Sequence, residues 1–139
     1  HLTTRRQRQM CIRDSGEMYR DFTYVEDLVR GIRLLIDAVP QSPYGGIVPE
    51  GDSLSPVAPY RVVNIGNSDK VKLLDFVKAI EDVLGKKAIC NFMPMQMGDV
   101  PGTWADSTLL HSLTGYRPQT DVRHGIACFV DWYRDYYKD

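Results

Sequence analysis

Cysteine and histidine are scarce in this chain of 139 residues, which has three of each. The cysteines stand at positions 11, 90 and 128, and no two of them share the C-x-x-C spacing of a zinc or redox site. The histidines at positions 1, 111 and 124 are equally scattered, which excludes a metal-binding spacing. We therefore assign no metal ligands, and we expect the cysteines to be ordinary thiols of a reducing compartment.

Long apolar runs are also absent, because no stretch approaches the roughly 20 apolar residues that span a bilayer. The first residues lack the apolar segment of a secretory signal. These two absences favour a cytoplasmic protein without a membrane partner. The formal net charge is −1, although residues 1–15 carry four arginines against one aspartate. That basic segment has no aromatic residue on which a base could stack, so we expect no nucleic-acid partner.

Three catalytic patterns are missing. The chain has no G-x-G-x-x-G turn to hold a dinucleotide, and no G-x-S-x-G nucleophile elbow. None of its eight tyrosines is followed four residues later by lysine, so a Tyr/Lys acid–base pair on one helix is excluded. We therefore assign no catalytic and no cofactor-binding residue, and we expect this chain alone to be inactive.

Residues 1–15 show neither helical nor strand periodicity, whereas a regular pattern begins at Gly16. The run from Arg6 to Ser15 resembles translated sequencing-adapter sequence. We interpret 1–15 as a non-native or disordered junction and 16–139 as one domain.

The rest of the chain alternates short strand patterns with helical ones. The pattern predicts strands at 18–24, 60–65 and 88–92, helices at 25–39, 73–84, 107–114 and from 121, and a long loop at 40–59. Gly85 is expected to end the second helix in a left-handed conformation, and Thr120 to cap the last one. This order indicates a small α/β unit. Three short strands are too few for a stable sheet on their own, so we expect the unit to pack against a larger missing domain.

Three places concentrate polar groups. Arg20, at a strand–helix junction, has the planar, multi-donor group that suits a diphosphate, or it forms a structural ion pair with an aspartate; the residues alone favour neither. The turn at 64–67 is expected to place Gly66 in a conformation that a side chain disfavours. In the Met-rich and Pro-rich loop 93–101, Asp99 can accept hydrogen bonds from a ribose diol, unless the loop is only a rigid surface segment.

Five segments, in this order, resemble the extended short-chain dehydrogenase/reductase epimerases that act on nucleotide sugars, and most resemble UDP-glucuronate 4-epimerases. They are YRDFTYVEDLVRGI, YRVVNIGN, VKLLDFVKAIEDVLGKKA, MQMGDVPGTWADSTLL and GYRPQTDVRHGIACFVDWYRDYY. The resemblance extends from about Gly16 to the end of the chain. It implies the small C-terminal substrate-binding lobe of a Rossmann-type epimerase, without the parallel-sheet domain that carries NAD and the Tyr-x-x-x-Lys pair.

The resemblance also implies roles for particular residues. Arg20 matches an arginine that contacts the diphosphate, and Asp99 matches an aspartate that binds a ribose hydroxyl. Gln96 stands where galactose-type epimerases carry a second phosphate-binding arginine. Met97 replaces an expected proline, and Trp104 replaces a more usual tyrosine. The implied ligand is a UDP-sugar, and the implied full-length enzyme is a homodimer that associates through the missing domain.

Two alternatives stay open at this point. The same blocks occur in sugar-nucleotide dehydratases and decarboxylases, whose discriminating residues would lie outside this chain. The chain can also be a stand-alone binding module without a catalytic partner.

Overall fold

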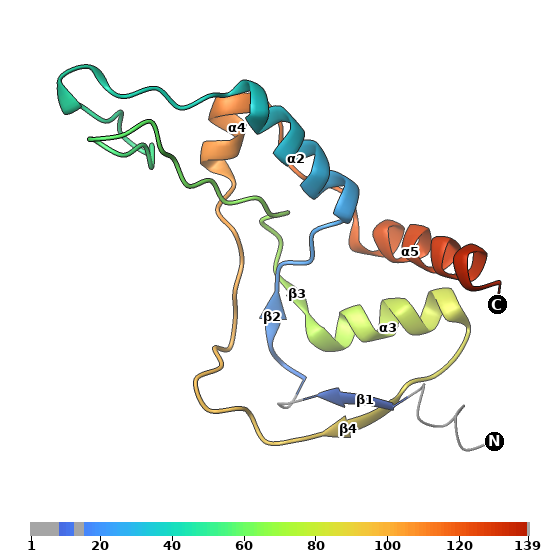
Figure 1. Ribbon diagram of the computed structural model, residues 1–139. Coiled ribbons are helices and arrows are strands. Elements are labelled where there is room, and N and C mark those ends of the chain that lie inside the picture. Colours follow the sequence, from blue (N-terminus) through green and yellow to red (C-terminus); the bar gives the residue numbers. More distant parts are fainter. Residues whose placement is uncertain (1–8, 13–15, 139) are drawn as a thin grey trace. The chain divides into compact units, whose positions relative to one another are not determined.

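The computed structural model describes residues 9–12 and 16–138, and these form two compact units. One contains the described residues of 1–22, 69–104 and 121–139, and we call it the α3–α5 unit; the other contains 23–68 and 105–120, and we call it the α2–α4 unit. Figure 1 labels the elements of both units. The sequence predicts a single domain over 16–139, and this stays a prediction.

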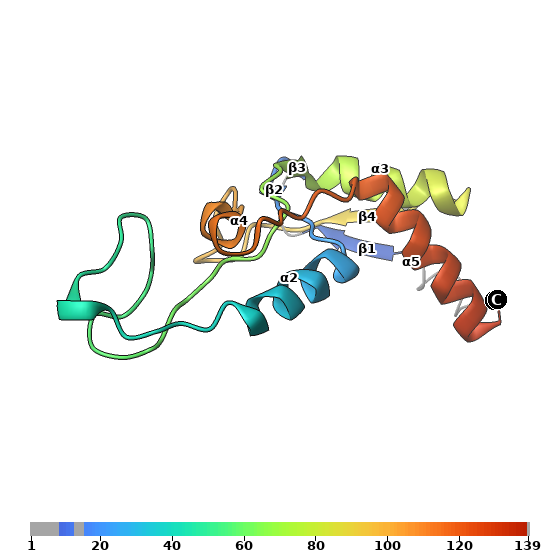
Figure 2. The same ribbon diagram turned by 90° about the horizontal axis from the view of Figure 1, so that it is seen from above.

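Two helices form the core of the α3–α5 unit. Helix α3 (Leu73–Leu84) packs against α5 (Val122–Tyr137), and the two lie side by side in Figures 1 and 2. Their contact buries Ala79, Ile126 and Val130, with Phe76 and Val122 partly buried around them. The apolar spacing in the last helix predicts a core stripe of Val122, Ile126, Phe129, Val130 and Tyr133. Burial confirms it at Ile126 and Val130, whereas the prediction is wrong at Phe129 and Tyr133, whose side chains are exposed.

Two short sheets complete this unit. Strand β1 (Gln9–Ile12) runs parallel to β4 (Ile89–Phe92), with Gln9 opposite Ile89. Strand β2 (Tyr19–Arg20) runs antiparallel to β3 (Val71–Lys72). Strand β1 lies within the segment that showed no periodicity. The strand is defined by its partner β4 rather than by its own periodicity. The interpretation of 1–15 as a non-native or disordered junction stays a prediction, since residues 1–8 and 13–15 lie outside the described part of the chain.

The helix ends follow local chemistry. Gly85 ends α3 with φ 64°, the left-handed conformation predicted for it. At the start of α5 the cap is Asp121, not the expected Thr120. The Asp121 carboxylate accepts hydrogen bonds from the backbone N–H groups of Arg123 (2.9 Å) and His124 (3.2 Å). A carboxylate at this position satisfies two free N–H groups and also meets the positive end of the helix dipole.

The α2–α4 unit is built on helices α2 (Val25–Asp37) and α4 (Thr108–Thr114). Gly31 is the only buried residue of α2. A Cβ at Gly31 would lie 3.1 Å from Ile65 and 3.7 Å from Leu110, so the absence of a side chain lets both neighbours approach the helix closely. Leu110 of α4 is fully buried.

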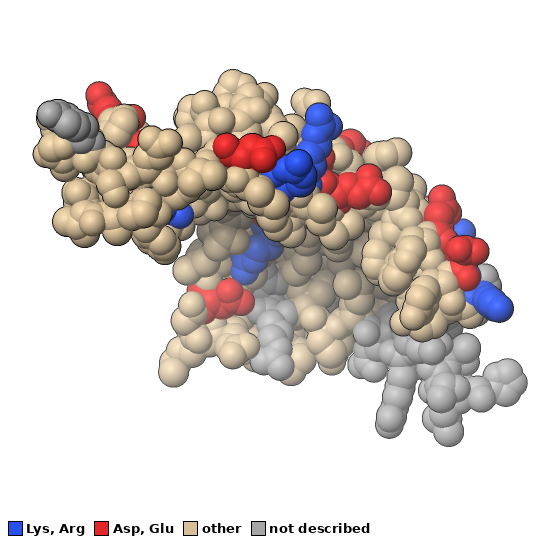
Figure 3. Space-filling view, turned by 45° about the horizontal axis from the view of Figure 1, so that its top comes forward, with Lys and Arg blue, Asp and Glu red and all other residues tan. Residues whose placement is uncertain are grey.

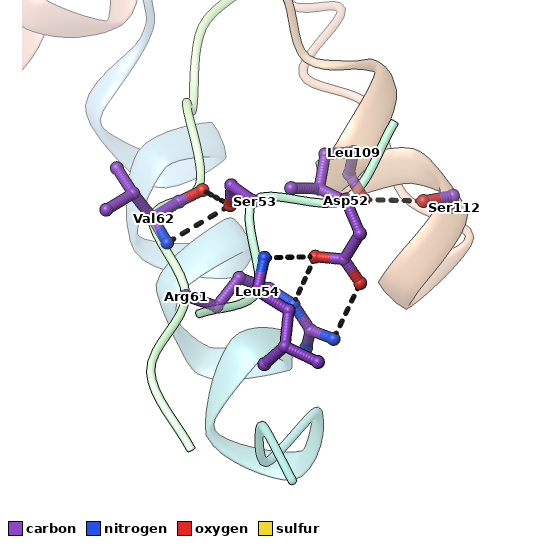
Figure 4. A network of polar contacts seen from close by, with 7 residues as sticks. All are labelled: Asp52, Ser53, Leu54, Arg61, Val62, Leu109 and Ser112. Atoms are coloured by element: carbon purple, nitrogen blue, oxygen red, sulfur yellow. Dashed lines mark hydrogen bonds and ion pairs between the residues drawn. The ribbon is translucent and has the colours of Figure 1, made fainter. Parts of the chain in front are cut away.

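The long loop between 38 and 59 contains one short 3-10 turn, η1 (Tyr44–Gly46). An ion pair fixes its second half (Figure 4): Arg61 donates from Nε and Nη2 to the two carboxylate oxygens of Asp52, both at 2.8 Å. The same carboxylate accepts from the N–H of Leu54 at 2.9 Å. Ser53 adds side-chain hydrogen bonds to both backbone groups of Val62. A bidentate Arg–carboxylate pair of low exposure gives this loop a defined path.

Two expectations for the next segment are wrong. Residues 60–65 form no strand ladder among the described residues, although their composition is that of a strand. The left-handed backbone of the following turn lies at Ser68 (φ 60°), not at Gly66. Gly66 instead donates to Ser107 Oγ at 3.2 Å and accepts from it at 2.6 Å, so the turn is tied to the start of α4. The fold class is confirmed: the chain is a small α/β structure with short sheets.

The cap of α5 gives a stability prediction. Replacing Asp121 with alanine should lower the free energy of unfolding by about 0.5–2 kcal/mol, because two N–H groups lose their acceptor. Urea unfolding followed by circular dichroism measures the change. The matched control is Asp131→Ala, an exposed carboxylate in the middle of the same helix; if both variants unfold alike, Asp121 is not a stabilising cap.

Candidate functional site

Arg20 lies at the end of β2, and its guanidinium is surrounded by acceptors. Nη1 donates to the carbonyl oxygens of Tyr19 (2.9 Å) and Val100 (3.2 Å). Nη2 lies 3.1 Å from Asp99 Oδ1 and 3.1 Å from the sulfur of Met18. The structure thus brings together two of the three predicted site residues, Arg20 and Asp99, from segments about 80 positions apart.

Backbone hydrogen bonds hold these two segments in register. Tyr19 donates to the carbonyl of Pro101 at 3.0 Å, and Thr103 donates to the carbonyl of Tyr19 at 3.2 Å. Tyr19 and Gly102 form a parallel bridge. A Cβ at Gly102 would lie 3.4 Å from the Trp104 ring, so the backbone at Gly102 passes close to that ring. The result is a short tether between β2 and the loop that carries Asp99.

The turn at 96–99 positions the third predicted residue. The Asp99 N–H donates to the carbonyl of Gln96 at 3.1 Å, and Gly98 takes φ 90°. Asp99 Oδ1 also accepts from the Val100 N–H at 3.1 Å, which orients the carboxylate toward Arg20. Gln96 therefore belongs to the same turn through its backbone, and it is exposed.

Exposure decides what this ion pair can do. The side chains of Arg20 and Asp99 are 26% and 39% exposed, so solvent screens their attraction. Exposed ion pairs contribute only about 0–1 kcal/mol. An incoming diphosphate offers more negative charge and more oxygens than one carboxylate, and it can take over the donors of Arg20. Asp99 would then be free to accept from hydroxyl groups.

Two further cations border the site, and the sequence did not single them out. Lys72 of β3 lies 2.9 Å from Glu17, and this hydrogen bond raises the pKa of the lysine. Lys70 Nζ lies 3.6 Å from the centroid of the Trp104 ring, a cation–π contact. Lys70 and Trp104 are 34 positions apart in the sequence, so no local sequence pattern predicts their contact.

Asp27 of α2 is a carboxylate with several hydrogen-bond donors around it. It accepts from the Tyr116 hydroxyl at 2.6 Å and from the N–H groups of Thr120 (2.9 Å) and Gln119 (3.3 Å). Burial raises its pKa, but these hydrogen bonds outweigh burial and leave the pKa of Asp27 lowered. Burial and the Asp27 carboxylate together raise the pKa of Tyr116 to about 12. Asp27 is therefore a structural anchor.

The remaining candidates give no second site. His111 and His124 are exposed. Among the described residues no group of three His, Cys, Asp or Glu side chains could hold a metal ion. No helix in that part of the chain is long and apolar enough to cross a membrane. On the face drawn in Figure 3, the coloured side chains form small groups of both signs rather than one basic surface.

Comparison with known proteins gives consistent relatives, although no protein-family model matches. The chain is 45% identical over 133 residues to a probable UDP-glucuronate 4-epimerase of Rhizobium meliloti, covering 94% of this chain and 39% of the relative. It is 39% identical over 123 residues to UDP-glucuronate 4-epimerase 4 of Arabidopsis thaliana, covering 88% of this chain and 27% of the relative. The chain thus spans well under half the length of these proteins.

Solved structures agree with this match. A UDP-glucuronic acid 4-epimerase from Bacillus cereus, in complex with UDP-glucuronic acid and NAD, superposes with a TM-score of 0.69 at 26% identity. The match covers 93% of this chain and 36% of the epimerase. Sequence and structure therefore point to the same group of proteins.

The Asp27 cluster gives a pH-dependent prediction. Tyr116→Phe should lower the free energy of unfolding near neutral pH by about 1.5–3 kcal/mol, because a hydrogen bond to a charged group is lost. In the wild type, Asp27 contributes stability above its unfolded pKa near 3.8, and this is lost as the pH falls through the lower folded value. Tyr116 contributes stability below its unfolded pKa near 10, and this is lost as the pH rises toward about 12.

Urea unfolding at acidic, neutral and alkaline pH measures these changes. The Phe variant should show a flatter profile at both ends. Tyr60→Phe is the control, since Tyr60 is an exposed tyrosine of the same unit. Equal profiles for the two variants would contradict the anchoring role of the cluster.

Proposed function

Because the chain belongs to the NAD-dependent nucleotide-sugar epimerases and matches the C-terminal part of their UDP-glucuronate 4-epimerase members, we propose that it forms the nucleotide-sugar-binding lobe of such an enzyme. The observation that supports this role most directly is the exposed Arg20–Asp99 pair, a donor group and an acceptor group that lie 3.1 Å apart where β2 is hydrogen-bonded to the loop that carries Asp99. The proposed substrate is UDP-glucuronate, interconverted with UDP-galacturonate.

Each residue of the pair has a separate task in this proposal. The Arg20 guanidinium exchanges its contact with Asp99 for oxygens of the diphosphate, and the released Asp99 accepts from a ribose hydroxyl. Gln96, on the same turn, faces the phosphates as an uncharged hydrogen-bonding group. Binding at these points fixes the nucleotide, so that the sugar is presented in a single orientation to the reacting groups.

The residues present do not fit NAD. Strand β3 leads directly into α3, and β2 leads into α2 through Asp21, Phe22, Thr23 and Tyr24. Neither junction in the described residues has the glycine-rich turn that lets a pyrophosphate approach a helix N-terminus. We therefore place NAD binding and hydride transfer in the part of the relatives that the match does not cover. We propose that the full-length enzyme is a cytoplasmic homodimer and that its subunits associate through the same uncovered part.

The first test separates binding from turnover. The purified chain should show no interconversion of UDP-glucuronate and UDP-galacturonate with added NAD. A fusion to the preceding part of the Rhizobium meliloti relative should restore it. Nucleotide-sugar products are measured by chromatography. Turnover by the chain alone, or none by a folded fusion, would contradict the proposal.

The second test concerns Arg20 in that fusion. Arg20→Ala should weaken UDP-glucuronate binding by about 1.5–3 kcal/mol, because a charge-assisted contact to phosphate is lost. Isothermal titration calorimetry measures the affinity. The control Arg33→Ala removes an exposed arginine whose partner is Asp37 of the same helix, and it should leave the affinity unchanged. If Arg20→Ala also leaves it unchanged, the arginine only ties β2 to its loop.

A further inference from the structure

Met18 differs from the other neighbours of the Arg20 guanidinium because it is buried. Only 7% of Met18 is exposed, whereas Tyr19 and Val100 are 37% and 47% exposed and the Asp99 side chain is 39% exposed. Arg20 Nη2 lies 3.1 Å from the Met18 sulfur and 3.1 Å from Asp99 Oδ1. One nitrogen of the guanidinium therefore contacts a buried acceptor and an exposed acceptor at the same time.

The position of Met18 is set by the start of helix α3, not by the loop that carries Asp99. The Met18 carbonyl accepts from the N–H of Leu73, the first residue of α3, at 2.9 Å. The next residue, Tyr19, is paired with Lys72 in the ladder of β2 and β3. The backbone of Met18 is thus held from the α3 side, and its sulfur keeps its place when Asp99 changes partner.

The chemistry of the sulfur suits a permanent contact with an arginine that must bind an anion. A thioether is an uncharged, weak acceptor, so it takes an N–H without neutralising the positive charge of Arg20. A carboxylate in its place would form a charge-assisted pair and compete with a phosphate. Nη2 of a guanidinium carries two hydrogens. One can stay with the Met18 sulfur while the other passes from Asp99 to an oxygen of a ligand.

From this geometry we propose that Met18 is a positioning residue for Arg20, whose Nη2 stays on the buried sulfur while it exchanges Asp99 for the diphosphate of a nucleotide sugar. This rests on the proposed function and adds to it the residue that orients the arginine. Nη1 donates to the carbonyls of Tyr19 and Val100. With the sulfur on Nη2, the guanidinium is held at two nitrogens, so less conformational entropy is lost on binding.

The test uses the fusion to the preceding part of the Rhizobium meliloti relative and measures UDP-glucuronate affinity by isothermal titration calorimetry. Met18→Leu removes the sulfur at nearly constant volume. It should weaken binding by about two- to tenfold, because the guanidinium must then be ordered when the ligand binds. The control Met93→Leu makes the same change at an exposed methionine of the α3–α5 unit and should bind like the wild type.

Two further variants separate positioning from packing. On the Arg20→Ala background, Met18→Leu should cause no additional loss of affinity, because the sulfur then has no guanidinium to orient. A loss caused by packing alone would persist on that background. Met18→Gln supplies an uncharged oxygen acceptor on a side chain of similar length, and it should bind within about twofold of the wild type. Thermal midpoints are measured for every variant.

Three results would each overturn the inference: unchanged affinity of Met18→Leu, an equal loss on both backgrounds, or a folded Met18→Gln that binds as weakly as Met18→Leu. If Met18→Gln lowers the thermal midpoint, the comparison of the two backgrounds decides. The proposed role of Arg20 fails when Arg20→Ala leaves the affinity unchanged, and the inference then fails with it. The inference fails alone when Arg20→Ala weakens binding and Met18→Leu does not.

Discussion

The hydrogen-bonded strip that joins β2 to residues 99–103 is the constraint on which the candidate site depends. Tyr19 exchanges backbone hydrogen bonds with Pro101 and Thr103 on that strip. Because these hydrogen bonds fix the backbone of both segments, they bring the Arg20 guanidinium and the Asp99 carboxylate together at an exposed position. The ion pair is then a consequence of the tether, and it is free to exchange partners because it contributes little to stability.

The tether also explains why the two readings of Arg20 are compatible. A structural ion pair and a ligand-binding arginine are usually opposed, but here Arg20 also donates to two backbone carbonyls. These fixed acceptors orient the guanidinium while its contact with Asp99 remains exposed to solvent. A side chain held in this way loses less conformational entropy on binding a phosphate than a free one.

The sequence predicted well wherever local chemistry decides the structure. Helices α2, α3 and α4 and the left-handed Gly85 follow from apolar periodicity and from the glycine at the end of a helix. Arg20 and Asp99 are candidate site residues on residue type alone, without knowledge of their contact. The errors arise from long-range pairing. Strand β1 exists through β4, whereas 60–65 has strand character but no ladder. The Asp27 cluster and the Lys70–Trp104 contact depend on residues far apart in the chain, which no local pattern encodes.

The eight residues from Arg20 to Asp27 cross the boundary between the two units. At one end, Phe22 stacks on Phe76 with ring centroids 3.8 Å apart, and at the other, Asp27 holds Tyr116. This continuous sequence motif therefore supplies packing residues to both units and one residue to the candidate binding site. If the same stretch occurs in a distant protein, it indicates a shared architecture as much as a shared chemistry. Within the stretch, only Arg20 indicates ligand binding.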